Sequence, residues 1–279
     1  VGVLGVLGGG VLGALFQLFR LMAARKAPEI RKACAFNIPA VAMVMGSDRF
    51  SAEMRQTLLA LGCDQIIPIR RTISAGLHEV LAVLGKAHSG LLRDSFLRLL
   101  QDSPEVSEPM INNLGQCLQT FNMGLDDVAS FESALIDCND KLVQSRDWRL
   151  HRSLVWQFQF IHKFTSVSFI MEKLLPLMFE LLHGNVCFIL SLFSSKLKPN
   201  SLNHTQKKYV MPVKEAAVKS MCSIVYCGVK TLQKRREVCD KMKDEFYRGT
   251  SYSERLTFLN ICQEMSTTFC RRFFKDVFW

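Results

Sequence analysis

The sequence of 279 residues predicts an all-α protein, a solenoid of about five to six antiparallel helix pairs that is a fragment of a longer array. Three observations predict this class. Apolar residues recur at i, i+3, i+4 and i+7 through segments of about 10 to 18 residues. Patterns typical of strands are nearly absent, and Gly, Pro, Asp or Asn separate the apolar segments. A short motif, an apolar residue followed by a basic one, recurs roughly every 40 residues.

The composition agrees with a folded, helical protein. Apolar residues make up 49% of the chain, which is ample for a core and too many for a disordered protein. The ten cysteines contain no C-x-x-C pair, and most of them stand among apolar residues of predicted helices. We therefore expect reduced, structural thiols and a cytoplasmic location.

The first 19 residues carry no charge and include six glycines. A membrane span needs about 20 apolar residues, and glycine weakens an isolated helix, so we expect no membrane association. We expect residues 1–27 to form a separate apolar segment that is poorly ordered at its start, up to residue 13, and merges into a helix beyond Phe16.

The same stretch contains a G-x-G-x-x-G pattern, which in dinucleotide-binding folds lies between a strand and a helix. Such a site also needs an acidic residue about 20 positions later, at the end of a second strand. Glu29 stands at about that distance, but the sequence after Pro28 indicates a helix and no second strand. We therefore expect no cofactor site at Gly8, Gly10 and Gly13.

The first helices of three pairs are visible from their periodicity, in "SAEMRQTLLALG", "GLLRDSFLRLLQD" and "FIMEKLLPLMFELL". The second helices are marked by the recurring motif, as in "EIRKA", "PIRRT" and "PVKEA". Its first residues are 39, 37, 44, 63 and 41 positions apart, and they are Ile30, Ile69, Val106, Leu150, Val213 and Glu254. A helix-pair period of about 40 residues is typical of HEAT-type repeats.

This repeat gives the motif a structural role. The apolar residue begins the second helix and faces the core, and the basic residue beside it points along the stack. There it can meet an acidic residue from the turn of the next repeat, and a ladder of such pairs sets the register between repeats. Asp64 can pair with Arg31 in this way, and Asp102 with Arg70. Lys214 takes the basic position of a later repeat.

One spacing is irregular, the 63 residues from Leu150 to Val213. Removing the 25 residues 187–211 would leave a spacing of 38, close to the others. This segment begins apolar and continues with Ser, Lys, Pro and Asn without helical periodicity. We therefore predict repeats over residues 28–186 and 212–279, with residues 187–211 as an inserted loop.

Over residues 28–279 the chain resembles the HEAT-repeat regulatory subunits of serine/threonine protein phosphatase 4 and, more distantly, the scaffold subunit of protein phosphatase 2A. The stretches that carry the resemblance are "IRKACAFNIPAV", "PIRRTISAGLHEVLAVLG", "DWRLHRSL", "PVKEAAVKSMC" and "YSERLTFLNICQEMSTTFCRRFFKDVF". The resemblance implies a non-catalytic, cytoplasmic regulatory or scaffold subunit that binds a serine/threonine protein phosphatase catalytic subunit. It also implies that the partner meets the turns within the repeats, which we place around Asp64–Pro68, Gln101–Pro104 and Gln144–Arg149. The candidate contact residues in these turns are Asp64, Gln65, Gln101, Asp102, Trp148 and Arg149.

The residues themselves indicate no enzyme. No G-x-S-x-G, P-loop or H-E-x-x-H motif is present, and the six histidines are scattered. We expect no catalytic residue, no cofactor, no metal and no small-molecule substrate. An alternative is a transport or nucleic-acid-binding helical-repeat adaptor that uses residues 196–255, where 14 Lys and Arg stand against 6 Asp and Glu. No aromatic residues alternate with these cations as in a base-stacking surface, so nucleic acid is not the expected partner.

Overall fold

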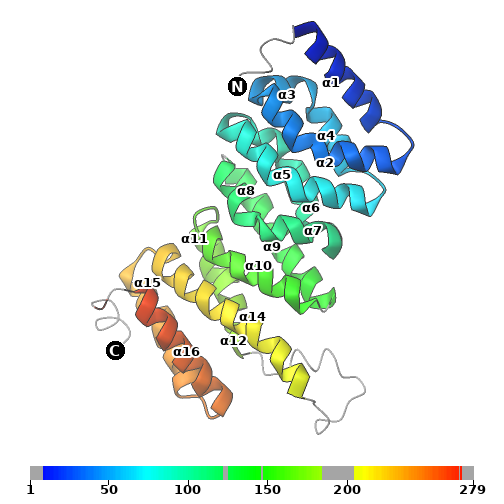
Figure 1. Cartoon of the computed structure of the whole chain (residues 1–279). Coiled ribbons are helices and arrows are strands. Elements are labelled where there is room, and N and C mark those ends of the chain that lie inside the picture. Colours follow the sequence, from blue (N-terminus) through cyan, green and yellow to red (C-terminus); the bar gives the residue numbers. More distant parts are fainter. Residues whose placement is uncertain (1–8, 122–124, 146, 184–203, 270, 272–279) are drawn as a thin grey trace. The chain divides into compact units, whose positions relative to one another are not determined.

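The structure is a computed structural model that describes residues 9–121, 125–145, 147–183, 204–269 and 271. Side chains are described for these residues except 9, 125, 126 and 204–210. The described residues form helices and turns, and no strand occurs among them, which confirms the all-α prediction. The chain divides into two compact units, Val1–Cys138 and Asn139–Trp279, and each is a stack of helix pairs (Figure 1).

Unit 1 contains three helix pairs. The first helices are α1 (Gly9–Ala23), the two consecutive helices α3 (Ser47–Glu53) and α4 (Arg55–Gly62), and the 3-10 turn η1 (Ser89–Leu92) followed by α6 (Arg93–Leu100). The second helices are α2 (Pro28–Met45), α5 (Ile67–His88) and α7 (Pro104–Asn112) with its continuation α8 (Leu114–Thr120). The next helix, α9 (Leu125–Ser145), passes from unit 1 into unit 2.

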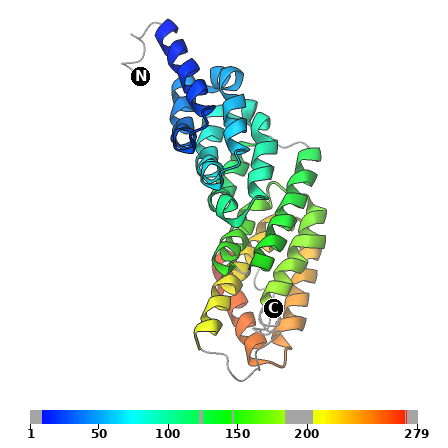
Figure 2. The ribbon, with the colours of Figure 1, turned by 90° about the vertical axis from the view of Figure 1, so that its right-hand side faces the viewer.

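The second helices of unit 1 lie side by side and form one layer of helices. Helix α2 packs along α5, and α5 packs along α7 (Figures 1 and 2). The contact between α2 and α5 is close at Gly76, where an added Cβ would lie 2.8 Å from the Cγ of Pro39. The absence of a side chain at Gly76 thus lets the two helices approach each other.

Unit 2 repeats the arrangement with three further second helices, α10 (Trp148–Ile161), α14 (His204–Ser223) and α16 (Tyr252–Thr268). They lie in this order, because α14 packs against both α10 and α16 (Figure 1). The first helices of the later pairs are α11 (Val167–Phe169) with η2 (Ile170–Leu174) and α12 (Leu175–His183), and α15 (Leu232–Met242) with η5 (Lys243–Tyr247). A π-helical turn, η4 (Ile224–Gly228), continues α14.

Local sequence explains where most second helices begin. A proline occupies the first turn of α2, α5 and α7, where its missing N–H costs no hydrogen bond. Asp147 caps α10 by accepting hydrogen bonds from the backbone N–H groups of Arg149 and Leu150. Ser251 and Glu254 form a reciprocal capping box at the start of α16. The motif therefore marks the start of a helix and also supplies an apolar residue to the core.

The motif's apolar residues face the core in four of the five repeats that have one. Ile69 and Val106 are fully buried, and Leu150 and Val213 are nearly so. Ile30 departs from the prediction, since 36% of its surface is exposed. It lies at the edge of unit 1, where α1 is the only described helix that precedes α2, and α1 leaves its side chain uncovered.

Two boundaries differ from the sequence prediction. Helix α1 begins at Gly9, so residues 9–13 are helical, and residues 1–8 lie outside the described residues. Packing of α1 on α2 and α4, with Phe16 and Ala23 buried, outweighs a helix penalty of about 1 kcal/mol per glycine. Gly10 and Gly13 therefore stand in a helix that no described strand precedes. In the part of the chain that the structure describes, no helix has the length and apolar character to cross a membrane.

The second boundary concerns the predicted loop at residues 187–211. Residues 187–203 lie outside the described residues, but α14 begins at His204, so the end of the predicted loop is helical. The sequence predicts that a second helix begins at the motif "PVKEA", whereas Pro212 of this motif stands inside α14. A proline within a helix removes one hydrogen bond without always ending the helix.

The close approach at Gly76 makes a testable prediction. Gly76→Val should lower the free energy of unfolding by about 1–3 kcal/mol, because the new side chain would collide with the rigid ring of Pro39. Ala75→Val, on the exposed side of the same helix, is the matched control and should cost only about 0.5 kcal/mol. Urea unfolding followed by circular dichroism measures both, and equal costs would contradict the packing interpretation.

Candidate functional site

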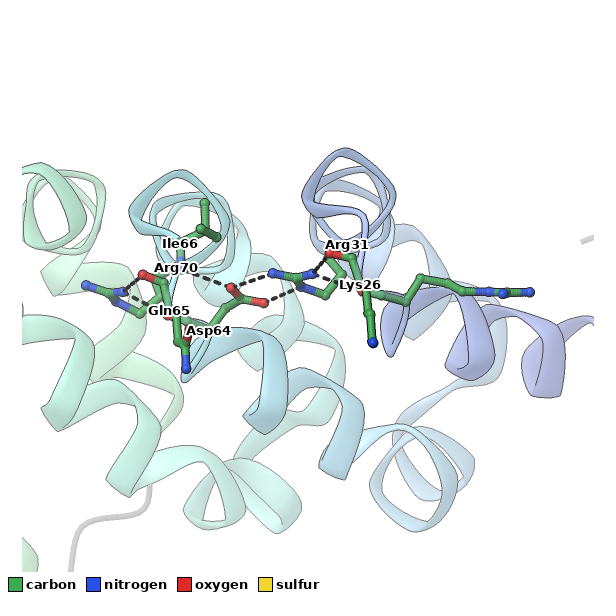
Figure 3. A network of polar contacts seen from close by, with 7 residues as sticks. Lys26, Arg31, Asp64, Gln65, Ile66 and Arg70 are labelled. Atoms are coloured by element: carbon green, nitrogen blue, oxygen red, sulfur yellow. Dashed lines mark hydrogen bonds and ion pairs between the residues drawn. The ribbon is translucent and has the colours of Figure 1, made fainter.

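The turns of unit 1 are joined by a ladder of arginine and aspartate side chains (Figure 3). Arg31, in the first turn of α2, reaches the carboxylate of Asp64 in the turn between α4 and α5. Its Nε donates to Oδ2 at 2.6 Å, and its Nη2 donates to Oδ1 at 3.0 Å. This two-point contact fixes the guanidinium plane as well as the distance.

The remaining edge of the same guanidinium closes the turn before α2. The Nη1 of Arg31 donates to the backbone carbonyl oxygens of Arg25 and Lys26, at 2.9 and 2.7 Å. One side chain thus holds its own turn and the turn of the following repeat. The link between neighbouring repeats therefore needs arginine, because a lysine ammonium lacks this planar fork of donors.

Arg70 repeats the arrangement one helix pair later. Its Nε and Nη2 donate to Asp102, at 2.7 and 3.0 Å. Its Nη1 donates to the carbonyl oxygens of Asp64 and Gln65, at 2.8 and 3.2 Å. Both arginines thus bind the carbonyls six and five residues before themselves and the carboxylate of the next turn.

Asp64 is the centre of this network. Its carboxylate accepts from Arg31 and from the backbone N–H of Ile66 at 2.9 Å, while its carbonyl accepts from Arg70. Only 9% of the Asp64 side chain and 15% of the Asp102 side chain are exposed. These carboxylates are therefore occupied within the stack, and water screens them little.

The ladder changes the acidity of both carboxyl groups. The hydrogen bonds from Arg31 lower the pKa of Asp64 below its usual value, against the opposing effect of burial. At Asp102 burial is the largest influence and raises the pKa, but hydrogen bonds from Arg70 and from the Ser103 backbone outweigh it. The pKa of Asp102 is therefore also lowered, and both groups are carboxylates at neutral pH.

The other repeats use different side chains at the motif's basic position. Ser107 follows Val106, so the ladder ends at Asp102. In unit 2 the position holds His151, whose Nε2 lies 3.1 Å from Oδ1 of Asn139 in a buried contact. Burial lowers the pKa of His151 to about 4, so this contact is made by a neutral imidazole.

Lys214 is buried, and no ion pair of Lys214 occurs within the described ranges. Burial lowers its pKa, and the charge of Glu254 opposes that effect. It thus stands apart from the arginine ladder of unit 1. Arg255, in the last repeat, donates from Nη1 to the carbonyl of Thr250 at 3.0 Å, with the same offset of five residues as Arg31 and Arg70.

The ladder leaves an exposed ridge on unit 1. Gln65 is exposed, and Ile66 and Ile67 beside it are 39% and 37% exposed. Gln101, in the following turn, is half-buried and donates to Asp137 at 2.9 Å. The two isoleucines lie in the predicted contact turn Asp64–Pro68, although they are not among the six candidate contact residues. Their signal is "QIIP", two apolar residues in a turn just before a proline.

The remaining candidates lie in unit 2, at the start of α10. Trp148 is half-buried, and the guanidinium carbon of the exposed Arg149 lies 4.7 Å from the centroid of its ring. Such stacking keeps both side chains at the turn, with the ring shielded on one face. Trp148 and Arg149 thus form a small aromatic and cationic surface at the capped end of the helix.

Comparison with known proteins gives a consistent result, although no protein-family profile matches the chain. Serine/threonine-protein phosphatase 4 regulatory subunit 4 is 27% identical over 265 residues in Mus musculus and over 267 in Homo sapiens, each match covering 91% of this chain. The chain is related to the phosphatase 4 regulatory subunits. Regulatory subunit 1 of Homo sapiens is 26% identical over 156 residues, 55% of this chain. The resemblance predicted from the sequence is thus confirmed, but the chain spans only 27% of the mouse subunit 4 that it matches.

The ladder predicts a contrast between two adjacent arginines. Arg70→Ala should lower the free energy of unfolding by about 1–3 kcal/mol, because it removes the arginine's hydrogen bonds to the Asp102 carboxylate and to two backbone carbonyls. Arg71→Ala is the matched control, since its pair with Glu108 is about half-exposed on both sides and should cost less than about 0.5 kcal/mol. Chemical unfolding measures both variants. An Arg70→Ala cost as small as that of Arg71→Ala would mean that Arg70 acts only as a surface charge.

The lowered pKa of Asp102 predicts how the ladder depends on pH. Because the folded pKa lies below the unfolded one, the stabilisation is complete above about pH 5 and is lost as the pH falls below about 4 toward the folded pKa. The difference in unfolding free energy between wild type and Asp102→Asn should therefore shrink over this window. Asp94→Asn, whose side chain is 89% exposed, should show no such change. A difference for Asp102→Asn that stays constant down to about pH 3 would contradict a role for its charge.

Proposed function

We propose that this chain is part of a non-catalytic, cytoplasmic regulatory subunit that binds a serine/threonine protein phosphatase catalytic subunit. The main support is the relationship to proteins named as phosphatase 4 regulatory subunits over 91% of the chain. The eight described cysteines are all free thiols, in keeping with a reducing compartment. The chain would act by holding its partner in position, not by chemistry of its own.

The ridge of unit 1 is the surface that we propose for this contact. Asp64 and Asp102 are held by arginines, so they would shape the ridge without touching the partner directly. Gln65, Ile66 and Ile67 would make the contact, because they are exposed on a turn that the ladder holds fixed. A rigid turn loses little conformational entropy on binding, which favours affinity.

Trp148 and Arg149 remain a proposed second contact. Tryptophan and arginine are enriched among the residues that dominate protein interfaces, and here they stack on each other at a helix end. Gln101 would contribute less, because its amide already donates to Asp137.

The alternative adaptor function gains little from the basic segment at residues 196–255. Lys241, Lys243 and Arg248 form ion pairs with acidic neighbours on the same helical segment. Arg235 donates to the carbonyls of Val229 and Tyr226. Three cations of the segment are thus paired with acidic side chains and Arg235 is held by the backbone, which leaves these four less available to a phosphate backbone.

The ridge predicts the effect of one substitution on partner binding. Ile67→Glu should weaken capture of the phosphatase 4 catalytic subunit by about tenfold or more, because a charge replaces an apolar contact. Glutamate in the first turn of α5 suits the helix dipole, so folding should be preserved. Binding of the purified catalytic subunit to the immobilised chain measures the effect.

Leu91→Glu is the matched control. Leu91 is 36% exposed in η1, outside the turns of the ridge, and its substitution should leave capture unchanged within about twofold. Trp148→Ala tests the second contact and should weaken capture by about fivefold or more. Wild-type chain that captures no catalytic subunit would contradict the proposed function. Wild-type levels of capture by Ile67→Glu would mean that the contact lies outside the ridge.

A further inference from the structure

The outer face shared by α10 and α14 carries a set of side chains that the fold does not require. The two helices are parallel neighbours whose register is fixed by two hydrogen bonds. Ser220 Oγ donates to the carbonyl of Val155 at 2.6 Å, and Ser223 Oγ donates to that of Gln159 at 3.2 Å. Residues 64 to 65 positions apart therefore stand level with each other, and the outward positions of the two helices form one surface.

This surface combines aromatic rings and charges. Along α10 the outward positions are four residues apart. With the offset of 64 to 65 positions, Glu215 and Lys219 of α14 stand one to two residues before the level of Arg152 and Trp156, and Tyr226 in η4 stands one to two residues beyond that of Phe160. Trp156, Phe160 and Tyr226 are 37%, 43% and 39% exposed. We call this surface the α10–α14 face, and its six residues are Arg152, Trp156 and Phe160 of α10, Glu215 and Lys219 of α14, and Tyr226 of its continuation η4.

Lys219 joins the two helices across this face. Its Nζ lies 5.0 Å from the centroid of the Trp156 ring, within the range of a cation–π interaction. The contact holds the ammonium group beside the indole and covers one face of the ring. Trp156 and the neighbouring Phe160 remain partly exposed, at 37% and 43%. A cation and an apolar surface are thus presented side by side.

The charge of the α10–α14 face is unbalanced. Arg152 and Lys219 are exposed, and neither forms an ion pair within the part of the chain that the structure describes. Arg149 and Lys163 add exposed cations toward the two ends of α10, and Glu215 is the one acidic residue of the face. Such a surface favours a negatively charged ligand with apolar groups.

We propose that the α10–α14 face binds an acidic, extended peptide segment of a partner protein, with an aliphatic or aromatic side chain as its anchor. The anchor would pack on the edge of Trp156 and on Phe160, while flanking carboxylates meet Lys219 and Arg152. From Arg152 to Phe160 the face is about 12 Å long, which is the span of about four extended residues. This size suits a short linear segment.

Nucleic acid fits the same face less well. Base stacking needs an open aromatic surface, and Lys219 lies over the Trp156 ring. Glu215, on the same helix as Lys219, would repel a phosphate backbone, whereas a peptide can place a neutral residue there. The proposal goes beyond the phosphatase contact, because it concerns another kind of ligand and six residues that are not among the proposed phosphatase contacts. It does not require the ridge of unit 1 to bind anything.

The test uses the 279-residue chain and a fluorescein-labelled synthetic peptide of about eight Asp and Glu residues around a central Leu-Phe pair, followed by fluorescence anisotropy. This peptide should bind about tenfold more tightly than a control peptide in which Asn and Gln replace Asp and Glu. Its affinity should fall as the salt concentration rises from about 50 to 300 mM. Lys219→Glu should weaken its binding by about tenfold or more, and Trp156→Ala by about fivefold or more.

Two control variants make the same kinds of change, a charge reversal and the loss of an aromatic ring, outside the α10–α14 face. Lys173→Glu reverses an exposed charge in η2, and Phe36→Ala removes a ring that is 75% exposed on α2. Both should leave binding unchanged within about twofold, and circular dichroism should show the same helix content for every variant.

Three results would overturn the proposal. The first is equal binding of the acidic and the neutral peptide, and the second is no effect of Lys219→Glu. The third is tighter binding of a single-stranded oligothymidylate of about ten nucleotides that is lost in Lys219→Glu, which would make the face a nucleic-acid site. Capture of the phosphatase catalytic subunit by Lys219→Glu is measured in parallel. It should stay at the wild-type level, so failure of either proposal is seen separately.

Discussion

The two-sided contact of a ladder arginine is the interaction on which the geometry of unit 1 depends. Arg31 and Arg70 each bind two carbonyls of their own turn and the carboxylate of the next turn. The apolar stacking of α2, α5 and α7 supplies most of the cohesion, but apolar contacts alone permit small shifts of one helix along another. The ladder sets the register, because the planar guanidinium accepts its partners in one orientation.

Unit 2 reaches a similar packing with other chemistry. The serine hydroxyls of α14 donate to carbonyls of α10, and a neutral histidine contacts Asn139 within the core. These contacts involve no charged partner, so they avoid the cost of burying an ion pair. The two units therefore share one architecture while different side chains set the register between their helices. Acid would protonate structural groups in both units, the ladder carboxylates in unit 1 and the buried His151 in unit 2.

The two units also present two different kinds of exposed surface. In unit 1 the ladder keeps the polar groups of the turns occupied and leaves Gln65 with two isoleucines exposed on a fixed ridge. In unit 2 the outer face of α10 and α14 presents cations beside aromatic rings. Under the two proposals, the ridge would hold the phosphatase catalytic subunit and the α10–α14 face would bind an acidic segment of a further protein.

The sequence by itself determined the helical class, the repeat and the choice of partners within the ladder. Periodicity of apolar residues is a local property, and the spacing of the motif is enough to pair Asp64 with Arg31 and Asp102 with Arg70. The sequence did not determine how far a helix extends when its own residues disfavour it. Residues 9–13 are helical because α1 packs on its neighbours, and Pro212 stands inside a helix although it resembles a helix start. Only the tertiary structure could show that Ile30 is exposed, that Lys214 forms no ion pair among the described residues, and that Lys219 lies over Trp156. These features depend on which helices meet and at what register, and that is fixed by contacts between residues far apart in the chain.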